Sequence, residues 1–253
     1  MSNPERQIST AVILAAGMGI RLGKRGEAVP KGLLEFGGKA LIVRSLEQLF
    51  NSGISKVYVV VGHLANEYEQ VLSQFNSVTT VLNPFYSTSG SMNSLLHVQH
   101  LVGEDFLLLE SDIIYELRGL TSLINSGTAS ALLVSGLTNS GDEVWVQEKS
   151  GRLSNLSKMI DVDEVVCGEF VGITKVSSNL FKHMCIFASN SVELLPQMDY
   201  EQALLAASEV EDVDVVLIED YVWGEVDNDD HERRILENVL PKIRASSARV
   251  DEH

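Results

Sequence analysis

Two glycines and two cations near the start of the chain have the types and spacing of a phosphate-binding loop. Gly17 and Gly19 follow an apolar segment, Arg21 comes two residues later, and Lys31 follows Pro30. Glycine lets the backbone approach an anion closely and point its N–H groups at it. Arginine offers a planar fork of donors to phosphate oxygens, and lysine offers a compact charge. The pattern predicts a loop that wraps a polyphosphate at the end of a buried strand.

Two common glycine-rich loops are excluded by the residues around Gly19. The dinucleotide-binding fingerprint needs a third glycine where the loop packs on its helix, and Leu22 stands there instead. The P-loop needs Gly-Lys-Ser/Thr, and no such tripeptide follows Gly19. A simple turn after a first strand is the alternative, but such a turn has no need of two spaced cations.

A carboxylate at the end of another apolar segment predicts a metal site. Asp112 follows the apolar residues 106–109 after only Glu110 and Ser111. Ligands of open parallel sheets lie outside the carboxyl ends of the strands, so we expect Asp112 to share a crevice with the glycine loop. Mg²⁺ binds through one or two carboxylates together with phosphate oxygens. This role is favoured over the alternative that Asp112 caps the following turn.

The order of the elements predicts the fold that positions these residues. Strand and helix patterns alternate through the first half, which is typical of βαβ units around a parallel sheet. The expected strands there lie near 10–16, 56–62, 78–82 and 105–110, with helices near 40–52, 64–75 and 91–101. The second half predicts strands near 129–136, 143–148, 152–160, 165–176, 213–218 and 221–226, with helices near 177–188, 199–209 and 229–241.

The predicted fold class is therefore α/β, with a mostly parallel mixed sheet, helices on both faces and a β-rich, lid-like extension. We expect one domain over residues 1–253, with a nucleotide-binding core at about 10–128. The lid-like half and the closing elements then occupy about 129–242.

Composition and charge narrow the class of protein. A formal net charge of −16 argues against a nucleic-acid partner, which needs Lys and Arg on a contact face. No apolar run is long enough to span a bilayer, and residues 1–6 lack the features of a signal peptide. Cys167 and Cys185 lie far apart without metal-ligand spacing, which favours a reducing cytoplasm. The oligomeric state is left open, a homodimer included.

The first motif resembles the signature of a known family. Residues 14–22 read Leu-Ala-Ala-Gly-Met-Gly-Ile-Arg-Leu and are followed, after a variable loop, by Pro30-Lys31. This is similar to the nucleotidyltransferases of Rossmann-like fold, which join a nucleoside triphosphate to a phosphorylated small molecule. The variable loop departs from the commoner family form, which often has a proline and a threonine where Lys24-Arg25-Gly26-Glu27 stand.

The resemblance implies roles for these residues. Arg21 and Lys31 are the implied catalytic cations, and Asp227, at the end of a late strand, is the implied partner of Asp112 in holding Mg²⁺. The implied phosphate-binding residues are Leu14, Ala15, Ala16, Gly17, Met18 and Gly19.

Later segments resemble the 2-aminoethylphosphonate cytidylyltransferases, with the bacterial choline-phosphate cytidylyltransferases as close relatives. The motifs that carry this resemblance include Asn83-Pro84-Phe85-Tyr86, Ser91-Met92-Asn93-Ser94-Leu95, Glu110-Ser111-Asp112, Gly141-Asp142-Glu143-Val144 and Tyr200-Glu201. The resemblance implies transfer of CMP from CTP to 2-aminoethylphosphonate with release of pyrophosphate. The residues implied to contact the base are Asn83, Ser89, Gly90, Ser91 and Asn93.

The acceptor is expected to bind in the lid half. A primary ammonium prefers carboxylates and hydrogen-bond acceptors, whereas a quaternary ammonium prefers an aromatic cage. Acids outnumber aromatic residues at the motif positions, which favours the primary amine. The expected acceptor-binding residues are Asp142, Trp145, Lys158, Glu169 and Glu201, with Lys158 as the candidate for the phosphonate.

Other functions stay open at this stage. Choline-phosphate cytidylyltransferases, and sugar-1-phosphate nucleotidyltransferases using another nucleotide, share the first motif and both acids. A non-catalytic nucleotide-binding regulator would tolerate loss of Asp112 or Asp227, and both are present. A nicotinamide-dependent oxidoreductase is disfavoured by Arg21 and Leu22.

Overall fold

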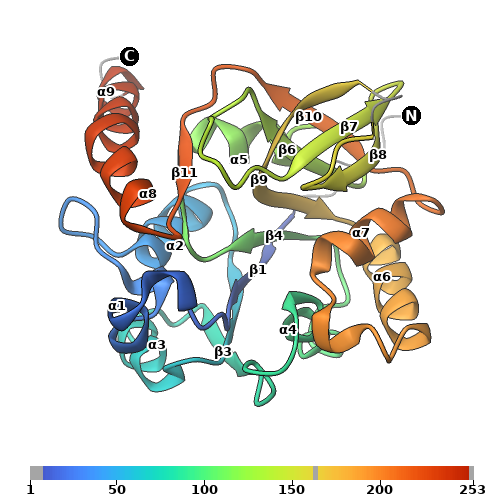
Figure 1. The fold of residues 1–253 in the computed structure, drawn as a ribbon, viewed down its shortest axis with the longest axis horizontal. Coiled ribbons are helices and arrows are strands. Elements are labelled where there is room, and N and C mark those ends of the chain that lie inside the picture. Colours follow the sequence, from blue (N-terminus) through green and yellow to red (C-terminus); the bar gives the residue numbers. More distant parts are fainter. Residues whose placement is uncertain (1–7, 162–164, 251–253) are drawn as a thin grey trace.

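A mixed sheet forms the centre of the molecule (Figure 1). The computed structural model describes residues 8–161 and 165–250. Within these ranges, nine strands are ordered β3-β2-β1-β4-β9-β6-β10-β8-β7, and β7 also pairs with β9. The strands are β1 (Thr10–Ala15), β2 (Lys56–Val61), β3 (Val78–Leu82), β4 (Phe106–Glu110), β6 (Ala131–Ser135), β7 (Trp145–Lys149), β8 (Arg152–Ser157), β9 (Val166–Val176) and β10 (Asp214–Ile218). A separate antiparallel pair joins β5 (Ile113–Tyr115) to β11 (Trp223–Glu225).

Helices cover both faces of the sheet because successive residues of the buried strands point to opposite faces. Ala11 and Ile13 of β1 pack on the side of α2 (Leu41–Asn51), α3 (Ala65–Leu72) and α5 (Leu117–Ile124). Val12 and Leu14 pack on the side of α4 (Ser91–Leu96), α6 (Ser178–Asn190) and α7 (Tyr200–Ser208).

A third apolar cluster lies under the C-terminal helices. Leu22, Phe36 and Val226 pack there against Ile235 and Leu240. The helices are α8 (Asp229–Arg234), a π-helical turn (Ile235–Val239) and α9 (Leu240–Val250). Figure 1 shows α8 and α9 on one side of the molecule and α6 and α7 on the other.

The register of the sheet brings the carboxyl ends of three strands to one edge. β1 runs parallel to β2 and to β4, with Ala15 opposite Val61 and Leu14 opposite Glu110. β9 then runs antiparallel to β4 and continues past it to pair with β7 in the second half of the chain. The segments after β1 and β4 therefore face the same space as residues 169–172 in the middle of β9.

The predicted fold class is confirmed, and the expected strands are present with small shifts of their ends. The sequence reasoning missed the segment after Asp112, which forms β5 and α5. The helix expected over 91–101 ends at Leu96, because residues 97–99 continue with hydrogen bonds to the carbonyl three residues back. The closing helix runs past residue 241 to Val250, and the wider π-helical turn precedes Pro241, which lacks a backbone donor.

In the described part of the chain, no helix is long and apolar enough to cross a membrane. The expectation about residues 1–6 lies outside the described residues.

Candidate active site

A cleft of about 630 Å³ opens at the carboxyl ends of β1 and β4. The loop after β1, residues 169–172 in the middle of β9, the start of α7 and the end of β11 also contribute to its wall. The predicted phosphate-binding residues all line it: Leu14, Ala15, Ala16, Gly17, Met18 and Gly19.

The glycine loop is shaped for close approach to a ligand. Gly19 has a φ of 61°, a left-handed conformation that glycine adopts without steric cost. A Cβ atom there would lie 3.4 Å from Lys31 Cγ, while a Cβ at Gly17 would meet nothing within 4 Å. The residues that depart from the family pattern form a short helix, α1 (Lys24–Ala28), after Arg21. The conformation of this variable loop, which the sequence left undetermined, is thus helical.

Lys31 lies between the two acids that were expected to bind metal. Its Nζ donates to Asp112 Oδ2 at 2.9 Å and also to Asp227 Oδ1. Burial works against the charge of Lys31, but the charges of Asp112 and Asp227 outweigh it and raise the pKa of the ammonium. Burial likewise works against ionisation of Asp227, yet Lys31 and its neighbours hold the pKa of Asp227 at about 2. Residues 31, 112 and 227 therefore converge, as the sequence predicted.

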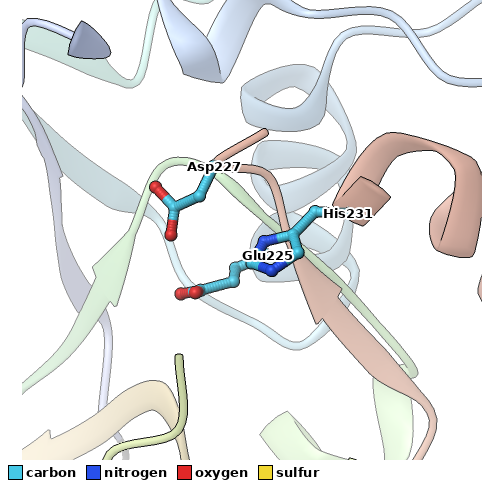
Figure 2. A group of neighbouring side chains, drawn as sticks. All are labelled: Glu225, Asp227 and His231. Atoms are coloured by element: carbon cyan, nitrogen blue, oxygen red, sulfur yellow. The ribbon is translucent and has the colours of Figure 1, made fainter. Parts of the chain in front are cut away.

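A second acid and a histidine lie beside Asp227 (Figure 2). Glu225 ends β11, His231 lies in the first turn of α8, and one ligand atom from each of the three residues lies within 4.8 Å of the others. Burial, followed by the hydrogen bond and charge of Asp227, raises the pKa of Glu225 to about 10. The sequence reasoning missed Glu225, although this second carboxylate stands two residues before Asp227 at the end of the same predicted strand.

These carboxylates suit a hard cation. Oxygen donors are what Mg²⁺ prefers, and His231 offers a nitrogen that suits softer metals better. Because Glu225 keeps its proton to a pH of about 10, the negative charge that would attract an ion comes from Asp112 and Asp227, and a bound ion would displace the proton of Glu225. Asp112, Glu225 and Asp227 are therefore the residues that could hold Mg²⁺.

Arg21 connects the glycine loop to the second half of the chain. It pairs with Asp227 at 2.8 Å and with Asp142, which also pairs with Lys158. Burial tends to raise the pKa of Asp142, but hydrogen bonds from Lys158 and Arg21 lower it. In this structure the three cleft cations are thus bound to Asp112, Asp142 and Asp227.

The segment expected to contact the base divides into two groups. Ser89, Gly90 and Ser91 line the cleft, whereas Asn83 and Asn93 are absent from its lining. Asn83 is buried, donates to Ser94 Oγ at 3.0 Å and accepts from the backbone N–H of Phe85 at 2.8 Å. Its amide therefore holds the turn before α4, and base contact by the three cleft residues stays a prediction.

The expected acceptor-binding residues also divide. Asp142, Lys158, Glu169 and Glu201 line the cleft, but Trp145 does not. Trp145 begins β7, where it lies opposite Glu169 of β9 and Ser157 of β8. Glu169 accepts from the backbone N–H of Thr138 at 2.9 Å and from its hydroxyl at 3.0 Å, so it anchors the loop before β7. The aromatic residues that do line the cleft are Tyr68, Tyr86, Phe170, Tyr200 and Trp223.

The cleft carries far more acids than bases. Its cationic side chains are Arg21, Lys31 and Lys158. Its carboxylates are Glu110, Asp112, Asp142, Glu169, Asp199, Glu201, Glu225 and Asp227. An anionic ligand is repelled by such a surface unless cations accompany it. The cleft is therefore suited to a ligand set that includes positive charge, such as Mg²⁺ or an ammonium group.

A glycine loop, two cations and strand-end acids at one edge of a parallel sheet define a nucleotidyltransferase type of site. The chain matches the model of the MobA-like NTP transferase domain over residues 11–213 and belongs to that family. The resemblance to nucleotidyltransferases is thereby confirmed.

Individual relatives are similar over parts of the chain. It is 31% identical over 137 residues to CMP-5'-(3-aminopropyl)phosphonate synthase of Streptomyces rubellomurinus. The aligned residues cover 53% of this chain and 22% of the relative. It is 26% identical over 152 residues to the choline-phosphate cytidylyltransferase of Streptococcus pneumoniae, and the match covers 56% of this chain and 66% of that protein. The matches to the first curated relatives span from 22% to 44% of their lengths.

A solved structure confirms the fold. The inositol-1-phosphate CTP transferase of T. maritima superposes with a TM-score of 0.79 at 20% identity, covering 95% of this chain and 98% of that one. At this level of identity, the likeness shows the fold alone.

Proposed function

We propose that the protein transfers CMP from CTP to 2-aminoethylphosphonate, giving CMP-2-aminoethylphosphonate and pyrophosphate. The observation that carries the proposal is the position of Lys31, which bonds to both Asp112 and Asp227 beside the glycine loop. The choice of CTP rests on the similar proteins, whose names include a CMP-aminopropylphosphonate synthase and a choline-phosphate cytidylyltransferase.

The proposed reaction needs positioning and charge neutralisation rather than a general base. A phosphonate oxygen, already anionic near neutral pH, attacks the α-phosphorus of CTP and forms a new P–O bond. The bond from the α-phosphorus to the bridging oxygen breaks, and its electron pair leaves with pyrophosphate. Holding two repelling anions together in line supplies much of the rate enhancement.

The residues of the cleft have separate tasks in this proposal. Gly17 and Gly19 present backbone N–H groups to the phosphates, and Arg21 binds the leaving β- and γ-phosphates. Lys31 neutralises the charge that builds on the α-phosphate in the transition state. Because Lys31 is already fixed between two carboxylates, it needs little reorganisation during the reaction.

Mg²⁺ is the expected cofactor, and the donor set fits it. Asp112, Glu225 and Asp227 would hold the ion, since they offer carboxylate oxygens in a cleft with surplus negative charge. When bound, the ion would neutralise phosphate oxygens of the nucleotide. The chain's own contribution is to keep Asp227 ionised at all working pH values through Lys31.

Phosphocholine is a second candidate acceptor. The rings of Phe170 and Tyr200 both line the cleft, with centroids 6.4 Å apart and planes tilted by 59°. Aromatic faces of this kind attract a quaternary ammonium.

Pyrophosphate release with purified protein and Mg²⁺ tests the proposal. CTP, UTP, GTP and ATP are each combined with 2-aminoethylphosphonate, phosphoethanolamine, phosphocholine and glucose-1-phosphate. We expect the highest kcat/KM for CTP with 2-aminoethylphosphonate. Turnover that is highest with glucose-1-phosphate and another nucleotide would replace the proposal by a sugar-nucleotide synthesis.

A further inference from the structure

We infer that Glu110 and Glu201 form a binding site for the primary ammonium group of the acceptor and that this site selects against a quaternary ammonium. The inference deepens the proposed function and rests on it. Glu110 ends β4, Glu201 lies in the first turn of α7, and both line the cleft. They are called the glutamate pair below.

Glu201 has a buried oxygen that needs a donor. Its Oε2 atom is inaccessible to solvent and has no hydrogen-bond partner among the residues that the structure describes. Burial first, and then the charge of Glu110, raise the pKa of Glu201 well above its usual value. A buried acceptor left unpaired destabilises the free protein, and a ligand that brings an N–H donor removes that cost. The carboxyl group is thus built to receive a hydrogen-bond donor.

Glu110 is held by contacts with Tyr200 and with the backbone of β9. The phenol of Tyr200 donates to Glu110 Oε1 at 2.7 Å. The other carboxyl oxygen lies against Gly172 of β9, where a Cβ atom would come within 2.8 Å of Oε2. Gly172 also has a φ of 80°, which other residues rarely adopt. Tyr200 and Gly172 therefore hold the carboxyl group of Glu110 so that its charge reaches Glu201.

Among the residues that the structure describes, no cation of the cleft forms an ion pair or a hydrogen bond with Glu110 or Glu201, although the charges of Lys31 and Lys158 act on them. Lys31 is bonded to Asp112 and Asp227, and Lys158 is bonded to Asp142. Arg21 bridges the same Asp142 and Asp227. The glutamate pair is left for a cation that arrives with the substrate.

The chemistry of the pair distinguishes two kinds of ammonium. A primary ammonium has three N–H donors, enough for Glu201 Oε2 and for the carboxyl group of Glu110. A trimethylammonium group has none, so Glu201 Oε2 would remain unpaired beneath it. Charge-assisted hydrogen bonds of this kind correspond to roughly 10- to 100-fold in kcat/KM.

The test compares acceptors that differ only at the amine. With saturating CTP, kcat/KM is measured for 2-aminoethylphosphonate, ethylphosphonate and 2-(trimethylammonio)ethylphosphonate. We expect the wild-type protein to prefer the primary amine over both others by about 10-fold or more. In Glu201→Gln the ratio of 2-aminoethylphosphonate to ethylphosphonate should fall to about one. Glu209→Gln, at the exposed end of the same helix, is the matched control and should keep the wild-type ratio.

Each outcome decides a different claim. A wild-type ratio near one, or a Glu201→Gln ratio equal to that of wild type, overturns the inference and leaves the cytidylyltransferase proposal standing. Equal rates with the trimethylammonium compound overturn the selectivity. Failure of CTP to react with any of the three acceptors overturns the proposed function and the inference with it. Circular dichroism and the KM for CTP of Glu201→Gln establish that the variant is folded.

Discussion

Replacing Lys31 by methionine removes the one charge that both Asp112 and Asp227 contact, while it keeps most of the side-chain volume. In the wild-type protein the Lys31 side chain is 17% exposed, and those of Asp112 and Asp227 are 20% and 3% exposed. Exposed ion pairs contribute about 0–1 kcal/mol, whereas breaking a buried pair costs about 3–5 kcal/mol. The site is intermediate, so we expect Lys31→Met to lower the free energy of unfolding by about 2 kcal/mol at pH 7.

The loss of stability should depend on pH with a definite sign. Lys31 holds the pKa of Asp227 at about 2, below the ordinary value of about 3.9. The stabilisation is therefore complete above pH 3.9 and is lost as the pH falls through 2. Urea unfolding of Lys31→Met and wild type should show a difference that is constant from pH 8 to pH 5 and narrows below pH 4.

The kinetic effect should separate turnover from nucleotide affinity. Removing one fixed donor from a developing charge typically lowers kcat by about 10²- to 10³-fold. Arg21 and the glycine loop would still hold the β- and γ-phosphates, so we expect the KM for CTP to change by less than about fivefold. Steady-state pyrophosphate release measures both quantities.

A lysine on the surface provides the matched control. Lys39 pairs with Glu47 outside the cleft, and both side chains are 40% or more exposed. Lys39→Met should change stability by less than about 1 kcal/mol and leave kcat unchanged. A Lys31→Met variant with wild-type kcat would refute the transition-state role, and one that loses CTP binding with little change in kcat would reassign Lys31 to ground-state binding.

Three further predictions concern other parts of the cleft. Gly19→Ala places a side chain at a φ of 61°, and the strain of about 1–2 kcal/mol should appear as a raised KM for CTP; unchanged kinetics would show that the loop tolerates another shape. Glu201→Gln should be more stable than wild type by on the order of 1 kcal/mol at pH 8. Burial raises the pKa of Glu201 because the folded protein destabilises its charged form, so the gain should be present above the ordinary pKa of about 4.3 and vanish near pH 4; thermal unfolding at both pH values measures it. Chelation by EDTA should abolish pyrophosphate release and added Mg²⁺ should restore it; full activity in EDTA would exclude a readily removed cofactor at Asp112, Glu225 and Asp227.

The parts of the site that the sequence predicted are those fixed by local pattern. An apolar run followed by Gly17, Gly19 and Arg21 defines a strand with a ligand-binding loop, and parallel pairing then brings Asp112 to the same edge. The alternation of apolar residues similarly predicted the strands of the core. These features depend on neighbours in sequence and on a general property of parallel sheets.

The parts that the sequence did not predict depend on long-range packing. Asn83 is of a type suited to a base edge, but its side chain is buried and donates to Ser94 Oγ, so it holds its own turn. Trp145 looked like a wall of the acceptor site, yet the pairing of β7 with both β8 and β9 takes it out of the lining. Glu110 lies beside Asp112 in a quoted motif, but its hydrogen bond from Tyr200 depends on the fold.

The most direct test of the central claim is the identity of the product. We would incubate the protein with CTP, 2-aminoethylphosphonate and Mg²⁺ and follow the phosphorus nuclei by ³¹P NMR. The account expects coupled phosphonate and phosphate resonances of a CMP-phosphonate anhydride, with one pyrophosphate formed for each. Release of free CMP with an unchanged 2-aminoethylphosphonate signal, or no loss of CTP, would contradict it.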